Sequence, residues 1–121
     1  MLDTKVINSL RALGEDFLCD IITIYLRDLN NFVNRIELAI NEKDVENGEI
    51  ASHSLKGASY SLGARAVGDV CYTFERGFDD ANFEGMDDML LHLKEEVILA
   101  ESELKHLQQK LERSMELLSE R

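Results

Sequence analysis

The sequence predicts an all-α fold, and three observations support this prediction. The chain of 121 residues contains no proline, so no position is forced out of a helix by a missing backbone donor. Apolar residues recur at intervals of three and four along most of the chain, which is the period of an amphipathic helix. Strand-like alternation is missing, and the one hairpin-type dipeptide, Asn47-Gly48, has polar helix formers on both sides. We therefore expect an antiparallel up-and-down four-helix bundle, with a short additional N-terminal helix and a long C-terminal helix.

Two helices are predicted in the N-terminal third of the chain. The first covers about residues 4–13 and ends near Gly14, because glycine allows the chain to turn. It places four apolar residues on one face: Val6, Ile7, Leu10 and Leu13. The second covers about residues 15–42, either as one long helix or as two helices with a bend near Asn30-Asn31. Its inward-facing residues are Leu18, Ile21, Ile22, Tyr25, Leu29, Phe32, Val33, Ile36 and Ile40.

Two shorter helices follow, and a glycine separates them. The third helix covers about residues 44–62, with Asp44 as an N-cap whose carboxylate accepts from free backbone N–H groups of the first turn. Gly63 suits the left-handed conformation that ends many helices. The fourth helix covers about residues 64–78. It turns four residues inward: Val67, Val70, Cys71 and Phe74.

The longest predicted helix covers about residues 84–118, after the loop "DDANFEG". Its inward residues alternate steps of four and three: Met86, Leu90, Leu93, Val97, Ala100, Leu104, Leu107 and Leu111. At 1.5 Å per residue such a helix is about 50 Å long, so its C-terminal half would extend past a short partner helix. We expect residues 4–29 to cover the apolar stripe of that half, which comprises Leu104, Leu107, Leu111, Met115 and Leu118. A monomer is favoured on this basis, and a dimer through the C-terminal helix is the alternative.

Length, charge and cysteine usage exclude several classes of protein. Residues 1–121 are expected to form one domain, because a chain of this length builds a single core. The net charge of −11 disfavours nucleic acid and anionic membrane surfaces, which both attract Lys and Arg. No apolar run is long enough to span a bilayer, and the N-terminus lacks a signal-peptide pattern. Cys19 and Cys71 are expected to be free and buried in a reducing compartment, which predicts a cytoplasmic protein.

The segment "ASHSLKGASYSLGA", residues 51–64, leads to the functional prediction. On a helical wheel His53 falls about 160° from the inward-facing Leu55, so its imidazole should face outward. Lys56 and Gly57 lie three and four residues further along the same surface. Glycine costs about 1 kcal/mol relative to alanine inside a helix, which indicates that the space left beside His53 is used by an approaching molecule. Close packing against a neighbouring helix is the other explanation for this glycine.

An exposed histidine beside a lysine and bare backbone suits the carriage of a phosphoryl group. A neutral imidazole has a ring nitrogen that can attack phosphorus, and Lys56 can interact with phosphoryl oxygens. The chain has no acidic residue from position 50 to 68, which predicts a locally positive window. No nearby general base is expected to activate water, so a phosphohistidine formed here should persist until a partner accepts the group. Three neighbours are interpreted as docking contacts for that partner: Ile50, Ser54 and Tyr60.

The same segment resembles the signature of histidine-containing phosphotransfer (HPt) domains. In that family a phospho-accepting His is followed by x-Leu-Lys-Gly, two small residues and a later Leu-Gly-Ala. The matching positions are His53, Leu55, Lys56, Gly57, Ala58, Ser59, Leu62, Gly63 and Ala64. "VCYTFE" resembles the family's following helix, with Cys71 and Glu75 at familiar places, and Ser52 replaces the usual Ala. The resemblance implies a four-helix bundle in which His53 carries the phosphoryl group, Lys56 is its charge partner and Gly57 leaves clearance.

The resemblance also implies partners, namely the receiver domains of response regulators and of a hybrid sensor histidine kinase. No cofactor of its own is expected, and Mg²⁺ would come from the partner receiver, because no carboxylate cluster is expected beside His53. His92 and His106 are interpreted as surface residues without metal-ligand spacing. A nucleotide-binding Gly-rich loop is not visible, so the chain is expected to be a phosphotransfer intermediate and not a kinase.

Two alternatives to this interpretation stay open. Met1 and the polar C-terminus suit a free-standing protein, but the phosphotransfer segment of a larger kinase would have the same sequence features. A helical adaptor or scaffold that acts by binding alone is the competing function from another class. Phosphate on the protein distinguishes the adaptor from the phosphocarrier.

Overall fold

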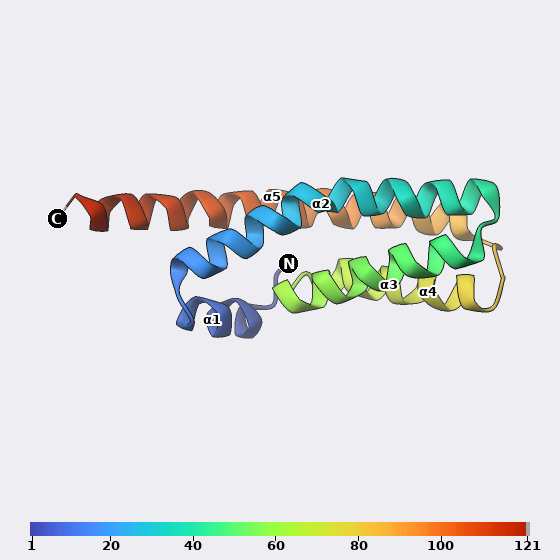
Figure 1. Ribbon diagram of the computed structural model, residues 1–121, viewed down its shortest axis with the longest axis horizontal. Helices are drawn as coiled ribbons and strands as arrows, with labels where there is room; N and C mark the ends of the chain where they lie inside the picture. Colours follow the sequence, from blue (N-terminus) through green and yellow to red (C-terminus); the bar gives the residue numbers. More distant parts are fainter. Residues whose placement is uncertain (121) are drawn as a thin grey trace.

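The computed structural model describes residues 1–120, and within them every regular element is an α-helix (Figure 1). The helices are α1 (Thr4–Ala12), α2 (Glu15–Glu42), α3 (Val45–Leu62), α4 (Arg65–Asp79) and α5 (Met86–Ser119). The predicted all-α class is confirmed, and the predicted helix ends differ from the observed ones by at most two residues. None of the described helices combines the length and the apolar character that a bilayer-spanning helix needs.

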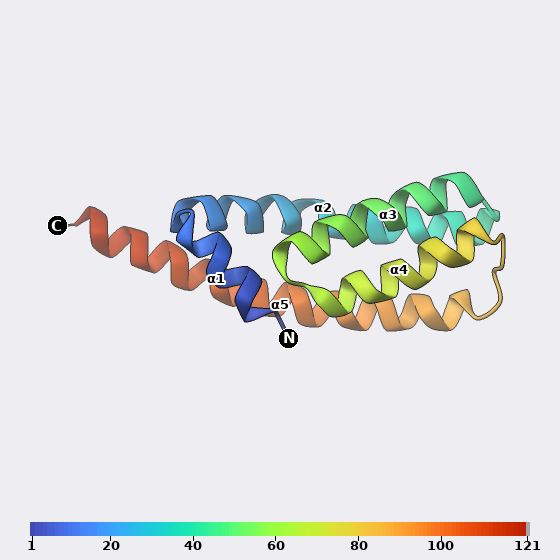
Figure 2. The same ribbon diagram turned by 90° about the horizontal axis from the view of Figure 1, so that it is seen from below.

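Helices α2 to α5 run alternately in opposite directions and form an antiparallel four-helix bundle (Figure 2). Each packs against two others around the bundle, in the order α2, α3, α4, α5 and back to α2. The short α1 packs against α2 and the end of α3. This arrangement agrees with the predicted up-and-down bundle with an additional N-terminal helix.

The core contains one continuous cluster of apolar side chains from all five helices. Its largest fully buried members are Leu18, Ile22, Leu29, Ile36, Leu55, Leu62, Val67, Phe74, Phe78, Met86, Leu93 and Leu104. Two buried serines of α3 have hydrogen-bond partners, as buried polar groups require. The Ser59 hydroxyl lies 2.8 Å from that of Tyr25, and the Ser52 hydroxyl donates to the Gly48 carbonyl at 2.7 Å.

The ends of α3 form as predicted. The Asp44 carboxylate accepts from the Asn47 backbone N–H at 3.1 Å, and Gly63 adopts a left-handed φ of 84°. The Gly63 carbonyl also accepts from the Asp3 backbone N–H at 2.8 Å. Asp3 in turn pairs with Arg65 at 2.7 Å, so the N-terminal segment is attached to the α3–α4 turn.

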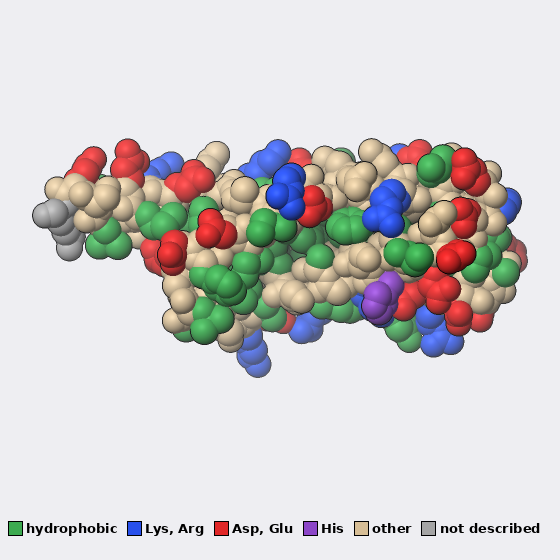
Figure 3. Space-filling model, in the orientation of Figure 1, with side chains coloured by type: hydrophobic (Ala, Val, Ile, Leu, Met, Phe, Trp, Pro, Cys, Tyr) green, Lys and Arg blue, Asp and Glu red, His purple; other side chains and the backbone are tan. Residues whose placement is uncertain are grey.

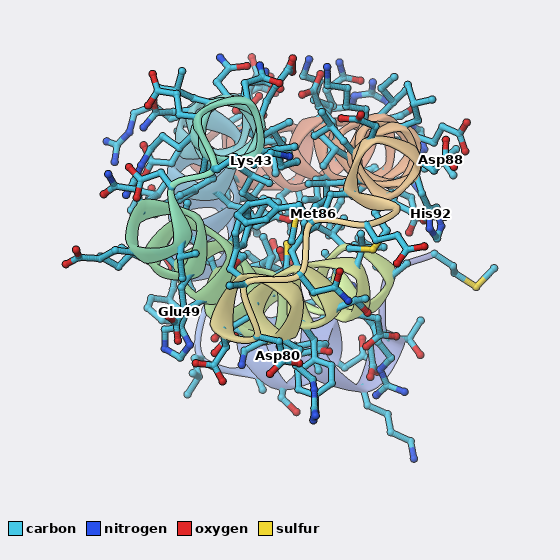
Figure 4. The ribbon with its side chains drawn as sticks, turned by 90° about the vertical axis from the view of Figure 1, so that its right-hand side faces the viewer. Lys43, Glu49, Asp80, Met86, Asp88 and His92 are labelled. Carbon is cyan, nitrogen blue, oxygen red and sulfur yellow. The ribbon has the colours of Figure 1, made fainter. Side chains whose placement is uncertain are left out.

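The opposite end of the bundle is closed by the α2–α3 turn and the α4–α5 loop (Figure 4). Lys43 has a left-handed φ of 55°, and its ammonium lies 4.7 Å from the centre of the Phe83 ring. Met86 points between the helices and is buried. These contacts hold the two connections together next to the first turn of α3.

Two predicted core positions are wrong. Leu13, expected on the inward face of the first helix, is 70% exposed, because α1 ends at Ala12 and the chain then reverses. Leu118 is 61% exposed, because α2 begins only at Glu15 and leaves the last turn of α5 without a partner helix. The bend considered near Asn30-Asn31 does not interrupt α2, which is a single helix.

The N-terminal part of the chain covers most of the α5 overhang, as predicted. Leu104 and Leu111 are buried, and Leu107 and Met115 pack against the core. Gln108 of α5 donates to the Thr23 hydroxyl of α2 at 2.7 Å, which ties the two helices together at this level. Packing within the chain therefore accounts for the burial of the apolar stripe of α5 up to Met115.

Candidate functional site

His53 lies near the middle of α3 and faces outward, which confirms the predicted orientation. Its side chain is 68% exposed. The Nδ1 atom of the ring lies 3.0 Å from Oε1 of Glu75, a residue of α4. The imidazole is therefore open to an approaching molecule on one side and held by a carboxylate on the other.

Glu75 contacts Lys56 as well as His53. Its Oε2 atom is buried and lies 2.7 Å from the Lys56 ammonium, while Oε1 contacts Nδ1 of the imidazole. Partial burial disfavours the charged carboxylate, but hydrogen bonds and charges from Lys56 and His53 outweigh this effect and lower the pKa of Glu75. Glu75 is consequently ionised at neutral pH and acts as a bridge between the two α3 side chains.

The presence of Glu75 corrects the expected charge around His53. The stretch of α3 without acids predicted a locally positive window. This expectation is wrong, because α4 contributes an acid that is 22 residues away along the chain. A helical wheel of α4 could have indicated this, since Glu75 directly follows the buried Phe74 and therefore lies on the flank of the helix.

The Lys56 ammonium shares the Glu75 carboxylate with the imidazole. Its side chain is only 21% exposed, which is low for a lysine. The Nζ atom lies 5.5 Å from the centre of the Tyr72 ring in addition to its contact with Glu75. The predicted role of Lys56 toward a phosphoryl group stays a prediction, and the structure shows which contacts it would exchange.

Gly57 faces open space. A Cβ atom added at this position would meet no heavy atom within 4 Å, so the alternative of close helix packing is wrong for this glycine. Gly48 and Gly68 differ from it, because a Cβ there would overlap the rings of Phe78 and Tyr60, respectively. Of these three helical glycines, Gly57 is the one whose bare backbone is presented to the surroundings.

The three predicted docking residues lie around His53 in different environments. Ile50 is 48% exposed, Ser54 is half-buried, and the Tyr60 ring is 38% exposed. The Tyr60 hydroxyl donates to Asp69 at 2.6 Å, and its ring covers Gly68. Tyr60 is therefore fixed against α4, whereas Ile50 is free to contact another molecule.

An apolar groove that the sequence patterns did not reveal lies between α2 and α3. Its volume is about 170 Å³, and it is lined by Ile21, Ile24, Tyr25, Asp28, Phe32, Ala58, Ser61 and Leu62. Hydrophobic side chains gather along the line between these two helices in Figure 3. Ile24 is 51% exposed, and it could have been identified as a non-core residue on a helical wheel of α2.

The cysteines and the two remaining histidines have the predicted burial and exposure. Cys19 and Cys71 are free and buried, and burial raises the pKa of the Cys71 thiol to about 12. His92 and His106 are surface residues of α5. Within residues 1–120, no group of His, Cys, Asp and Glu side chains has the arrangement of a metal site.

Comparisons with known proteins identify the family. Residues 20–117 match the Hpt domain family, which covers most of the chain. Histidine-containing phosphotransfer protein 1 of Arabidopsis thaliana is 28% identical over 94 residues, covering 76% of this chain and 61% of the relative. Histidine-containing phosphotransfer protein 5 of the same plant is 33% identical over 73 residues, covering 58% and 46%. The matches thus span about half to three fifths of these curated relatives.

Solved structures agree with this assignment. Histidine-containing phosphotransfer protein B from Pseudomonas aeruginosa superposes with a TM-score of 0.86 over 90% of this chain and 95% of that chain. Because the two sequences are only 20% identical, this similarity supports the fold alone. Histidine-containing phosphotransfer protein MtHPt2 from Medicago truncatula is 28% identical, with a TM-score of 0.79 over 97% and 82% of the two chains. The bundle, the exposed histidine and the family match lead to one conclusion: the chain belongs to the Hpt domain family.

Proposed function

We propose that this protein is a phosphorelay phosphocarrier. His53 accepts a phosphoryl group from a phospho-aspartyl receiver domain or a kinase and passes it to the aspartate of a response-regulator receiver. The observation that supports this best is the exposed imidazole of His53, held through Nδ1 by the ionised Glu75 and with the Lys56 ammonium on the same carboxylate. The Hpt family match over residues 20–117 supports the same function.

The contact with Glu75 supports an assignment of the reacting ring nitrogen. An ionised carboxylate has no proton to donate, so Nδ1 must carry the hydrogen of this bond. The neutral imidazole then has its free lone pair on Nε2, the nitrogen that does not contact Glu75. We therefore assign the attack on phosphorus to Nε2.

The transfer itself is a single displacement at phosphorus. The Nε2 lone pair of His53 forms the P–N bond, and the P–O bond to the donor aspartate breaks with its electron pair remaining on the aspartate oxygen. The ring keeps the Nδ1 proton and becomes positively charged, and the neighbouring Glu75 carboxylate stabilises this charge. In the reverse direction the protonated ring leaves as neutral imidazole, which is a better leaving group than an imidazolate.

The protein supplies positioning and charge but not hydrolysis. Glu75 contacts the Nδ1 side of the ring, whereas the phosphoryl group is assigned to Nε2, so the carboxylate is not placed to activate a water molecule at phosphorus. Lys56 shares Glu75 with His53, and rotation of its flexible side chain would let it exchange the carboxylate for a phosphoryl oxygen. A phosphohistidine should consequently persist until an acceptor aspartate arrives.

We further propose that the receiver domain docks over the groove between α2 and α3 and over Gly57. The groove is apolar, and exposed apolar surface of this kind is typical of protein-interaction sites. Its neighbours Ile24 and Ile50 extend the apolar surface. Any Mg²⁺ required for the aspartyl chemistry is assigned to the receiver, and the free thiols Cys19 and Cys71 support the proposed cytoplasmic location.

A phosphotransfer assay tests the proposed function directly. The purified protein is mixed with receiver domains phosphorylated with ³²P, and the phosphate transferred to it is treated with acid and with alkali. We expect label that acid removes and alkali leaves in place, as for a phosphoramidate. If no receiver from the source organism labels the protein but one binds it, the adaptor function is correct instead.

Gly57 provides a test of the proposed docking surface. Gly57→Ala should raise the free energy of unfolding by up to about 1 kcal/mol, because alanine favours the helix and its Cβ meets no neighbour. Gly57→Gln should also fold, but its longer side chain should slow transfer by obstructing the receiver. Urea unfolding and the transfer rate measure the two effects.

Gly48→Ala is the matched control for the stability measurement, because Gly48 is also a glycine inside α3. Its Cβ would overlap the Phe78 ring, so it should destabilise the protein by about 1–3 kcal/mol. A stable Gly57→Gln protein that transfers phosphate at the wild-type rate would contradict docking over this position.

A further inference from the structure

Tyr72 of α4 lies between two cations at the edge of the site. The centre of its ring is 5.5 Å from the Lys56 ammonium and 5.9 Å from the guanidinium carbon of Arg76. The Tyr72 hydroxyl accepts from Arg76 Nη1 at 3.2 Å. An aromatic side chain that is 46% exposed and contacts two cations is not explained by core packing.

Lys56 depends on Tyr72 and Glu75 for its position. A lysine side chain has four rotatable carbon–carbon bonds, and it loses entropy when its ammonium is held in one place. Glu75 attracts the ammonium through one oxygen at 2.7 Å, and the Tyr72 ring attracts it through its electron-rich face. The phosphoryl group would draw Lys56 away from Glu75, and the ring is the contact that can be kept during this exchange.

Arg76 has a different electrostatic environment from Lys56. Tyr72, Glu75 and Arg76 border a surface hollow of about 280 Å³ together with three further acids, Glu49, Asp79 and Asp80. Glu49 and Asp80 lie at the loop end of the bundle (Figure 4). Acids on this side repel a phosphoryl dianion and offset the charge of Arg76. Lys56 is therefore the cation available to the phosphoryl group, whereas Arg76 contacts the exposed hydroxyl end of Tyr72.

We propose that Tyr72 is a positioning residue that keeps the Lys56 ammonium beside His53 while it exchanges Glu75 for the phosphoryl group. This inference rests on the proposed phosphocarrier function and adds a residue that acts through Lys56. Tyr72 does not touch the reacting atoms. Its effect requires the aromatic face and not the hydroxyl group.

A double-mutant cycle tests the inference. Tyr72→Leu and Tyr72→Phe are each made in the wild-type and the Lys56→Met protein, and the rate of transfer from a phosphorylated receiver is measured with saturating receiver. Tyr72→Leu should slow the wild-type protein about three- to tenfold, as expected for loss of a partly exposed cation–π contact. Tyr72→Phe should stay within twofold of wild type, and Tyr72→Leu should have no further effect in the Lys56→Met background.

Several results would overturn the inference. Equal slowing by Tyr72→Leu in both backgrounds would show that the residue acts through docking or stability and not through Lys56. Slowing by Tyr72→Phe as large as that by Tyr72→Leu would assign the effect to the hydroxyl. Arg76→Gln is the control that removes the other cation, and a loss equal to that of Tyr72→Leu would assign the effect to Arg76.

A measurement without phosphate separates this inference from the proposed function. In the unphosphorylated protein the ring current of Tyr72 should shift the Lys56 ε-CH₂ protons upfield. The shift should remain in Tyr72→Phe and disappear in Tyr72→Leu. If the wild-type protein is never labelled, the phosphocarrier function and the inference both fail. If it is labelled but the Tyr72 variants lack the expected pattern of transfer rates, or the ring-current shift is missing, the inference alone is overturned.

Discussion

Replacing His53 by glutamine is expected to abolish labelling from a phosphorylated receiver. Glutamine has no ring nitrogen with a free lone pair, so the P–N bond cannot form. The loss should exceed about a thousandfold, because the nucleophile itself is removed. Because the His53 side chain is 68% exposed, the helix content and the thermal midpoint should change little.

His92→Gln is the matched control for this variant. His92 is also an exposed histidine, with a side-chain exposure of 58%, but it lies on α5 and pairs with Glu96. The His92→Gln protein should be labelled at the wild-type rate, because its His53 is intact. Label that persists in His53→Gln and disappears in His92→Gln would move the phosphorylated residue to α5 and refute the proposed site.

Substitution of Glu75 is expected to have the second-largest effect on transfer. Glu75→Ala removes the acceptor of the Nδ1 hydrogen and leaves the Lys56 ammonium without its carboxylate. A hydrogen bond to a charged group contributes about 1.5–3 kcal/mol, which corresponds to about a ten- to hundredfold lower rate. Glu75→Gln retains an acceptor oxygen but loses the charge, so its rate should fall between those of Glu75→Ala and the wild type.

Rates and an NMR readout together test the role of Glu75. In ¹⁵N spectra, wild-type His53 should carry its hydrogen on Nδ1, and Glu75→Ala should shift the tautomer equilibrium toward Nε2–H. Wild-type kinetics in Glu75→Ala would show that the carboxylate has no part in transfer. A slowed variant with an unchanged tautomer would show that Glu75 acts through Lys56 alone.

The pH dependence of stability should report the same carboxylate. The pKa of Glu75 is lowered in the folded protein despite the opposing effect of partial burial, so the folded state binds its proton less readily than the unfolded state. The resulting stabilisation is present above the ordinary pKa of glutamate and is lost as the pH falls through the lowered value. The difference in thermal midpoint between wild type and Glu75→Gln should therefore decrease as the pH is lowered below about 4.3, the ordinary pKa of glutamate.

Local patterns were sufficient to predict the helices and the orientation of His53. The 3.6-residue period of apolar positions depends on neighbouring residues alone, and it identified all five helices within two residues at each end. The same period placed His53 outward and Leu55 inward, and the structure agrees for both. Its failures, Leu13 and Leu118, lie at helix ends, where burial depends on whether another helix reaches that level.

The all-α class and an outward histidine beside bare backbone could be predicted from sequence, because a helix places these residues through local geometry. The contact of Glu75 in α4 with His53 and Lys56 of α3 depends instead on the tertiary structure. Gly48 against Phe78 and Gly68 against Tyr60 bring α3 and α4 close together on both sides of these contacts. Such a distance between helices follows from how their side chains pack, and a pattern within one helix does not contain that information.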